Sequence, residues 1–195
     1  NGFKSVLEDV NARLVLTRAG PDPPDTLTVR NILDAIKNNE NIRVKAVRLG
    51  DTLPLSPQVA TEILNPPVPG EFSRLSENDL SVVLKVGFHG SSVLLCGDIQ
   101  KRAEGLIVRR PISLRSEVLK VPHHGSNSSS SEQFLRRAAP SVGIISCGRR
   151  NPYGHPSPKV LERYQQFNIR LFRTDLHGGI VVRVFKEKLH VTTTL

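Results

Sequence analysis

The sequence predicts an α/β fold in which helices are layered on a partly antiparallel sheet. Short apolar runs of strand length alternate with segments whose apolar residues recur every three or four positions, as they do in helices. At least two pairs of strands follow one another as hairpins without a helix between them, which indicates a mixed sheet. The 195 residues contain no internal repeat and no linker of domain scale, so we expect one domain, or part of one, over residues 1–195.

The first third of the chain contains two expected helices and three expected strands. An apolar stripe predicts a short helix at 3–10, and Thr26 or Thr28 caps a second helix that reaches residue 38. Buried or alternating apolar runs predict strands at 12–17, 42–47 and 59–64. A polar, turn-rich stretch predicts an exposed loop at 68–77.

The rest of the chain alternates between strands and helices after one clear hairpin. Strands at 80–86 and 92–96 are separated by Gly87-Phe88-His89-Gly90, the best hairpin signal in the sequence. Helices are expected at 99–108, at 131–138 with a cap inside the serine run, and at 158–167 with proline at the start. Further apolar runs predict strands at 118–121, 142–146, 169–172, 180–185 and 189–193.

The chain is strongly basic, with a net charge of +9 and a pI near 10.1. Basic residues cluster in the pairs Lys101-Arg102, Arg109-Arg110, Arg136-Arg137 and Arg149-Arg150. Such pairs fit an ordinary solvated surface, and equally a surface that attracts a polyanion, nucleic acid first and anionic membrane second. With two Tyr and no Trp, an aromatic platform for base stacking is not indicated. No apolar stretch of the sequence approaches the roughly 20 residues of a membrane span, and no signal-peptide pattern is present.

The two cysteines, Cys96 and Cys147, both lie inside apolar runs. Free cysteine is among the most buried residue types, so we expect two buried free thiols. A disulfide between them is the alternative, although their spacing shows no framework signature.

Two apolar runs end abruptly at side chains that can bind metal ions. Residues 93–96 lead to Asp98, and residues 118–121 lead to His123 and His124. A glycine beside each set lets the backbone turn sharply, and strand ends are where a rigid scaffold presents ligands. Asp98 could instead form a turn or cap the helix that follows it, and the histidines could be ordinary surface residues. Because adjacent histidines point in different directions, we expect at most one of them to bind a given ion.

Two more polar groups follow later strands. His155 lies among prolines and a glycine in residues 151–158, which fix its direction. Asp175 follows the strand expected at 169–172 and is interpreted as a turn residue or as support for the ligands. Imidazole nitrogens and carboxylate oxygens are the ligands of zinc and manganese hydrolase sites, and one Asp can bridge two ions. The set therefore predicts half of a metal-dependent hydrolase site.

These motifs resemble the metallo-β-lactamase superfamily, and more closely the hydrolase domain of the ComEC competence proteins. The motifs that carry the resemblance stand at 77–84 (ENDLSVVL), 95–99 (LCGDI), 119–126 (LKVPHHGS), 145–148 (ISCG), 153–156 (YGHP) and 173–175 (RTD). They occur in the family's order, and the resemblance is specific over residues 65–182. It implies a metallo-β-lactamase-like αββα sandwich with metal ions at the sheet edges.

The resemblance assigns roles to individual residues. Asp98 matches the bridging aspartate, and His124 is the expected last metal ligand, with His123 facing the substrate. His155 matches a histidine that contacts phosphate or transfers a proton, and Asn78 stands where many members have a metal-binding histidine. The expected catalytic residues are Asp98, His123 and His155; the expected substrate-binding residues are Asn78, Ser126, Tyr153 and His155; Asp175 is expected to support the ligands.

The main metal motif of the superfamily, H-x-H-x-D-H, is absent from the sequence. Residues 1–3 resemble the stretch just after that motif, so we expect the chain to begin past its principal ligands, with the N-terminal strands of the fold missing. Two divalent metal ions, zinc or manganese, are expected in the complete protein. In this chain, Asp98 and His124 alone are expected to hold metal weakly or not at all.

The resemblance implies a phosphodiesterase or nuclease that acts on DNA, in the manner of competence proteins that function in DNA uptake. A ComEC-like hydrolase of a small phosphoester or lactone is one alternative, and a metal-free module that binds nucleic acid is another. The resemblance also implies a tether to a membrane channel protein, on the extracytoplasmic side of a bacterial membrane. Outside that family the expected location is cytoplasmic, and no oligomeric state is indicated.

Overall fold

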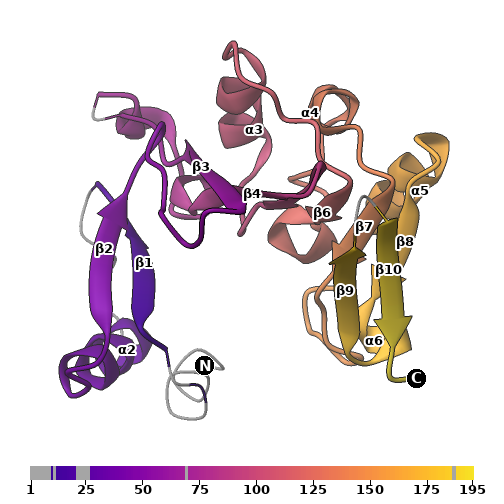
Figure 1. The fold of residues 1–195 in the computed structure, drawn as a ribbon. Helices are drawn as coiled ribbons and strands as arrows, with labels where there is room; N and C mark the ends of the chain where they lie inside the picture. Colours follow the sequence, from indigo (N-terminus) through magenta and orange to yellow (C-terminus); the bar gives the residue numbers. More distant parts are fainter. Residues whose placement is uncertain (1–9, 11, 21–26, 69, 186–187) are drawn as a thin grey trace. The chain divides into compact units, whose positions relative to one another are not determined.

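The computed structural model describes residue 10 and residues 12–20, 27–68, 70–185 and 188–195 (Figure 1). The chain divides into two compact units, Asn1–Val47 and Arg48–Leu195. The helix predicted at 3–10 lies outside the described residues, apart from its last position. The prediction of one domain over residues 1–195 stays a prediction.

The smaller unit is a strand–helix–strand arrangement. Strand β1 (Leu14–Arg18) pairs in parallel with β2 (Arg43–Val47), and α2 (Leu27–Lys37) connects them. Parallel strands need such a crossover, because a tight turn cannot reverse the chain and keep the strand direction. Buried Val15, Ile36 and Ile42 pack together in this unit. The two strands and the helix predicted here are confirmed.

The larger unit is built on a six-stranded sheet with the order β3-β4-β5-β6-β7-β8. The first three strands are antiparallel, and β5 to β8 are parallel. The predicted mixed α/β architecture is confirmed by this sheet. The strands are β3 (Val59–Asn65), β4 (Val83–Phe88), β5 (Ser91–Leu95), β6 (Val118–Lys120), β7 (Val142–Ile145) and β8 (Arg170–Arg173).

Three helices connect the parallel strands and pack on one face of the sheet. They are α3 (Lys101–Val108), α4 (Glu132–Ala138) and α5 (Pro158–Gln166). Crossovers between parallel strands are almost always right-handed, so successive helices fall on the same face. Their apolar side chains form the main core with inward residues of the strands, among them Leu94, Leu119, Phe134, Ile145 and Tyr164. Among the helices of the described ranges, none has both the length and the apolar character that a membrane crossing requires.

A hairpin covers the opposite face of the sheet. It consists of β9 (Ile180–Phe185) and β10 (Lys188–Thr193), which lie alongside β7 and β8 in Figure 1. Side chains of the hairpin pack against Val118, Val142 and Phe172 of the sheet. Neighbours on one strand point to opposite faces, so Val118 meets the hairpin and Leu119 meets the helices. Both hairpin strands were predicted and are confirmed.

The strand predicted at 80–86 is wrong at its start. Residues Asn78–Leu80 form a short 3-10 helix, η2, and β4 begins only at Val83. The hairpin turn is also tighter than the four residues predicted, because Phe88 already pairs with Ser91. His89 and Gly90 make the whole turn with φ angles of 47° and 79°, as a two-residue type I′ hairpin requires. A second 3-10 helix, η1 (Phe72–Arg74), lies in the predicted loop at 68–77.

Asp79 explains why η2 replaces the start of the predicted strand. Its side chain is buried, and Oδ1 accepts backbone N–H bonds from Gln100 at 2.9 Å and Ala103 at 3.2 Å. Oδ2 accepts the hydroxyl of Ser76 at 2.8 Å. A buried carboxylate is stable only when such donors surround it. Asp79 therefore caps the start of α3 from a distant part of the chain and fixes η2 beside it.

Glu104 binds backbone N–H groups of the serine run in a similar way. Its buried carboxylate accepts the backbone N–H groups of Ser130 and Ser131, the latter at 2.7 Å. The predicted position of the cap is confirmed, because Ser131 of the serine run is the N-cap residue of α4. Its side chain makes no capping hydrogen bond within the described structure. Arg163 of α5 donates to the carbonyl oxygens of Ser129 and Ser130 on the same segment. Burial raises the pKa of Glu104 above its ordinary value, although these hydrogen bonds act in the opposite direction.

The loop after β6 is packed tightly against the loop that follows β7. A Cβ atom built on Gly125 would lie 2.7 Å from Cβ of Pro156, and Gly125 has a φ of +80°. Ser157 N donates to the carbonyl oxygen of Gly125 at 2.9 Å, which holds the two loops together. Only glycine fits the space beside Pro156 and adopts this positive φ without strain.

Replacing Glu104 by Gln should change how stability depends on pH. A carboxyl whose pKa is raised in the folded state binds its proton more tightly there than in the unfolded chain. Its favourable contribution is complete below about pH 4.5 and is lost as the pH rises. The free energy of unfolding of the wild type, relative to Glu104→Gln, should therefore fall with rising pH, by at most about 1.4 kcal/mol per pH unit. Urea denaturation at pH 4 to 7 measures this difference, and a difference that grows with pH would contradict the assignment.

Replacing Gly125 by Ala should destabilise the larger unit by about 1–3 kcal/mol, because the methyl group overlaps Pro156 and the backbone is left-handed. Gly148→Ala is the matched control, since a Cβ there would meet no described atom within 4 Å and its φ is not positive. The control should stay within about 0.5 kcal/mol of the wild type in urea denaturation. Equal losses for the two variants would show that the contact with Pro156 is unimportant.

Candidate functional site

The candidate residues meet at one edge of the six-stranded sheet. Strands β5 to β8 are parallel, so their C-terminal ends lie at the same edge, and the antiparallel β4 begins there. In an open parallel sheet this edge is where ligands bind. The loops leaving it carry Asp98 after β5, the two histidines after β6, His155 after β7 and Asp175 after β8. Strand direction alone thus gathers residues that are up to 77 positions apart in the sequence.

The two adjacent histidines have unusual backbone conformations. His123 and His124 lie in η3 (Pro122–Gly125) with φ angles of 49° and 54°. Positive φ is uncommon outside glycine, and such residues cluster at functional sites. The rings are separated by 6.5 Å between centroids and inclined by 62°, so they face different surroundings. The backbone N–H of His123 donates to the carbonyl oxygen of Gly97 at 3.1 Å, which ties this loop to the loop of Asp98.

Asp98 and His124 face one another. Nε2 of His124 lies 3.5 Å from Oδ1 of Asp98, and both side chains are accessible, with 46% and 39% of their surface exposed. On the other side of the ring, Nδ1 lies 2.7 Å from the carbonyl oxygen of Ser146. A carbonyl oxygen only accepts, so Nδ1 carries the proton and donates it, and this bond turns Nε2 of the ring toward Asp98. This second hydrogen bond is the feature that orients metal-ligating histidines.

The alternative role of Asp98 as a helix cap is taken by another residue. Asp79, and not Asp98, accepts the N–H groups at the start of α3. The backbone of Asp98 is held instead by Ser81, whose Oγ accepts the Asp98 N–H at 3.1 Å. Gly97 is needed beside it, because its φ is +53° and a Cβ would approach Cβ of Ser81 to 2.7 Å. The carboxylate of Asp98 is thereby left at the edge of the sheet.

His123 points into a polar, half-buried corner of the site. Its Nε2 lies 3.4 Å from Nδ2 of Asn78. Its Nδ1 lies 3.4 Å from Nε2 of Gln100 and 3.3 Å from Oγ of Ser128. Ser128 also bonds to the hydroxyl of Ser126 at 3.0 Å, which makes Ser126 a buried neighbour of this corner. The structure thus brings Asn78 and His123 together and adds Gln100 and Ser128.

His155 completes a row of three imidazole rings. Its ring centroid is 5.8 Å from that of His123, and the exposed ring of Tyr153 stacks on it at 6.0 Å. Asn151 holds its backbone with hydrogen bonds to both N–H and carbonyl oxygen. Burial, and then the charge on His123 and His124, lowers the pKa of His155 below its ordinary value. His124, Tyr153 and His155 share a cavity of about 280 Å³ with residues of the 146–151 segment.

Asp175 contacts the segment that follows β7. It lies in α6 (Thr174–His177), and its carboxylate accepts from Arg173 Nε at 3.0 Å and lies 3.1 Å from Sγ of Cys147. The bond from Arg173 lowers the pKa of Asp175 to about 2, while burial and the bond to Asp175 raise the pKa of Cys147. Cys96 and Cys147 are both free thiols, as predicted, the first buried and the second half-buried. Thr174 adds two hydrogen bonds to the backbone of Cys147, the neighbour of Ser146.

Sequence reasoning missed several residues of the site. Ser146 contributes only a carbonyl oxygen, which no side-chain motif can reveal, although it directly follows β7, the strand next to β6. Gln100 lies two positions after Asp98 and could have been found from that proximity. Lys120 on β6 was also missed; burial lowers its pKa below the ordinary value, and the nearby negative charge of Asp98 only partly opposes this shift.

Asp98 and His124 form a pair, not a complete ligand set. Within the described ranges, no group of three or more His, Cys, Asp or Glu side chains is arranged to hold a metal ion. Catalytic zinc sites normally have three protein ligands. The pair could therefore contribute to a metal site but would need further donors.

Comparison with known proteins identifies bacterial relatives. The chain is 34% identical to ComE operon protein 3 of Bacillus subtilis over 171 residues, which cover 88% of this chain and 21% of the relative. It is 39% identical to competence protein ComA of Neisseria gonorrhoeae over 57% of this chain and 16% of the relative. It is 35% identical to recombination protein 2 of Haemophilus influenzae over 60% of this chain and 14% of the relative. No protein-family model matches the chain.

The chain thus spans between about a seventh and about a fifth of the length of these relatives. The matches with two of the relatives cover more than half of the chain, and the match with the Bacillus subtilis protein covers most of it. Taken together, the relatives point to the ComEC family of competence proteins.

Proposed function

We propose that residues 48–195 carry part of a metal-dependent site that hydrolyses phosphodiester bonds in DNA. The observation that carries this proposal is the pairing of Asp98 with His124, whose Nδ1–H is donated to Ser146 so that Nε2 faces the carboxylate. An ordinary surface histidine is not expected to have one ring nitrogen bonded to a backbone carbonyl oxygen and the other directed at a carboxylate, as His124 has. Both side chains are also accessible, which a substrate requires.

The layers of the larger unit support a metallo-β-lactamase-like fold as part of this proposal. Helices α3, α4 and α5 pack on one face of the six-stranded sheet, and the β9–β10 hairpin packs on the other. A helical layer, a sheet and the strands of a second sheet are three successive layers of an αββα sandwich. The candidate residues lie at the edge of the sheet, where the resemblance expects the metal ions.

The donor atoms of the pair fit zinc or manganese. One imidazole nitrogen and one carboxylate oxygen are suitable ligands for either ion, and the bond to Ser146 would keep the imidazole in the ligating orientation. A bound divalent ion would polarise the phosphodiester and stabilise the charge that develops during hydrolysis. Because only two donors are paired within the described residues, we expect this chain alone to bind the ion weakly.

We propose that His123 and His155 contact the substrate. Their rings lie side by side, and His155 lines the cavity that also contains His124. The lowered pKa of His155 favours the neutral ring near neutral pH. A neutral imidazole can still donate one N–H to a phosphoryl oxygen. This supports phosphate contact, rather than protonation of the leaving group, as the role of His155.

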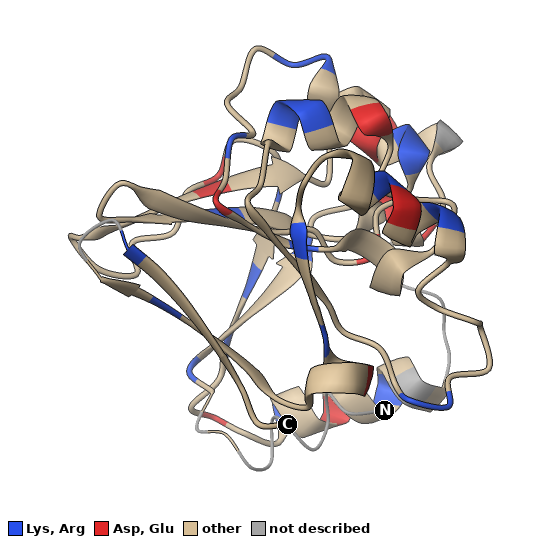
Figure 2. Ribbon diagram, turned by 90° about the vertical axis from the view of Figure 1, so that its right-hand side faces the viewer, with Lys and Arg blue, Asp and Glu red and all other residues tan. Residues whose placement is uncertain are grey.

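DNA is the proposed substrate because of the charge of the chain and the nature of its relatives. The net charge of +9 favours a polyanion, and one relative is named a competence protein and another a recombination protein. Figure 2 shows Lys and Arg on helices and loops, with acidic residues among them, so net charge alone does not locate the binding surface. A role in DNA uptake, a tether to a membrane channel protein and an extracytoplasmic position belong to the same proposal.

A metal-free nucleic-acid-binding module is the second candidate. The observation that favours it is the absence of a three-ligand group from the residues that the structure describes. It predicts no uptake of metal by the chain and no cleavage of DNA under any metal condition.

Cleavage of a labelled single-stranded oligonucleotide in millimolar manganese should depend on the pair. Asp98→Ala and His124→Ala should each lower the cleavage rate by about 100-fold or more, because each removes a ligand of the ion. His190→Ala is the matched control, since His190 is an exposed histidine of β10 far along the chain from the pair, and its activity should match the wild type. Gel analysis of the cleavage products measures the rates.

If Asp98→Ala cleaves DNA at the wild-type rate, Asp98 is not a ligand of the catalytic ion. If the wild-type chain neither cleaves DNA nor takes up manganese at millimolar concentration, the binding-module candidate replaces the hydrolase.

A further inference from the structure

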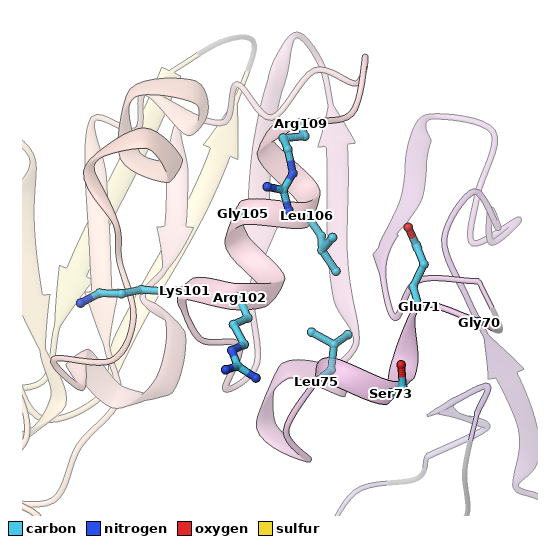
Figure 3. Close-up of a pocket in the computed structure, with 9 residues that line it drawn as sticks. All are labelled: Gly70, Glu71, Ser73, Leu75, Lys101, Arg102, Gly105, Leu106 and Arg109. Atoms are coloured by element: carbon cyan, nitrogen blue, oxygen red, sulfur yellow. The ribbon is translucent and has the colours of Figure 1, made fainter.

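A second cavity, of about 800 Å³, lies along α3 and does not include the Asp98–His124 pair. Its volume is in the range of binding clefts, roughly 300–1,000 Å³. One wall is α3, and the other is the segment around η1, with Glu71 and Ser73 facing the helix in Figure 3. The lining residues are Gly70, Glu71, Ser73, Leu75, Lys101, Arg102, Gly105, Leu106 and Arg109.

The helix residues of this cavity form one continuous face of α3. Positions 101, 102, 105, 106 and 109 recur with the spacing of one side of an α-helix. The opposite side, with Ala103, Glu104 and Ile107, is buried in the core. Gly105 leaves the middle of the face open, because a Cβ there would meet nothing within 4 Å among the described atoms.

The cavity carries positive charge. Lys101, Arg102 and Arg109 are exposed, and Figure 3 shows Arg102 and Arg109 extending from the helix beside the cavity. The carboxylate of Glu71 lies 2.6 Å from Nη2 of Arg110, so the acidic group of the facing wall is already paired with a cation. The lining therefore presents an excess of cations above an apolar floor formed by Leu75 and Leu106.

The start of α3 also touches the candidate site. Nε2 of Gln100, the N-cap residue of α3, lies 3.4 Å from Nδ1 of His123. The backbone N–H of Lys101 donates to the carbonyl oxygen of Ser128 at 2.9 Å. From Lys101 to Arg109 the helix rises about 12 Å. With about 3.4 Å per phosphate, as along one strand of a duplex, this length matches three or four phosphates. A ligand that leaves the site along α3 would thus meet the cations in turn.

We propose that the α3 cavity binds the sugar–phosphate backbone of a nucleic-acid strand and guides that strand to the Asp98–His124 edge. Lys and Arg contact phosphates without reading bases, so this binding should be independent of sequence. The apolar floor would take up sugars and the edges of bases. The nucleic-acid identity of the ligand rests on the proposed function, whereas the location of the site rests on the cavity and its cations.

The test is binding of a fluorescein-labelled single-stranded oligonucleotide to the full chain in EDTA, followed by anisotropy. The triple variant Lys101→Gln, Arg102→Gln, Arg109→Gln should bind at least 10-fold more weakly than the wild type near 100 mM salt. The slope of log K against log salt should fall by about 2, because three phosphate contacts are lost at about 0.7 each. The control triple Arg115→Gln, Arg183→Gln, Lys188→Gln removes the same charge from exposed positions elsewhere and should bind within twofold of the wild type.

A second pair of variants tests the site without removing any side chain. Gly105→Glu places a carboxylate in the open middle of the cavity, and Gly105→Ala adds only a methyl group at the same position. Both residues favour a helix more than glycine does, so both variants should fold. Gly105→Glu should weaken oligonucleotide binding at least fivefold more than Gly105→Ala does, because the two variants differ by the added carboxylate.

Equal weakening by the two triple variants would overturn the proposal, because net charge and not the cavity would then determine binding. It would also be overturned if the α3 triple lost binding to phosphatidylglycerol vesicles but kept oligonucleotide binding. EDTA separates this test from the hydrolase proposal. Loss of binding in the α3 variants supports the site even if no cleavage is found, and Asp98-dependent cleavage stands even if the α3 variants bind normally.

Discussion

The parallel register of β5 to β8 organises the larger unit. Leu94 pairs with Leu119, Leu119 with Gly143, and Gly143 with Leu171, so the four strands end together. The helices bury one face of this sheet and the hairpin buries the other. The candidate site therefore lies at the strand ends, where backbone groups need partners and side chains reach solvent. Asp98, His124 and the carbonyl oxygen of Ser146 meet there because of strand direction, not because of sequence proximity.

Two buried acidic side chains, Asp79 and Glu104, connect the segments near that edge by hydrogen bonds. Asp79 accepts N–H groups at the start of α3, and Glu104 inside α3 accepts those of the serine segment. Each would be costly to bury alone, and the backbone donors offset that cost. Asp79 binds the backbone just after Asp98, and Glu104 binds the segment that follows the histidines, so both segments are connected to α3. The exposed side of this helix forms one wall of the basic cavity, so α3 both braces the candidate site and presents the cations beside it.

The sequence was most informative where a residue acts through its own side chain at a strand end. Runs of apolar residues located the strands, and their ends drew attention to Asp98, His124 and His155. The sequence was uninformative where the partner is a backbone atom or a distant segment. The carbonyl oxygen of Ser146 has no motif, and the capping of α3 by Asp79, more than 20 positions away, overrode the local strand pattern at residue 80. The sequence contains the basic pairs at 101–102 and 109–110. It does not reveal that Lys101, Arg102 and Arg109 line one cavity, because this depends on the turn of the helix and on the segment that faces it.

We propose that Asp98 and Nε2 of His124 are donors to a divalent ion, with Nδ1 kept protonated by Ser146. Titration of the ¹⁵N-labelled chain with zinc, followed by imidazole ¹⁵N chemical shifts, tests it most directly. We expect that Nε2 of His124 moves to the shift of a metal-bound nitrogen, that Nδ1 stays protonated, and that Asp98→Ala abolishes the change. Unchanged His124 shifts at saturating zinc, or binding through Nδ1, would contradict it.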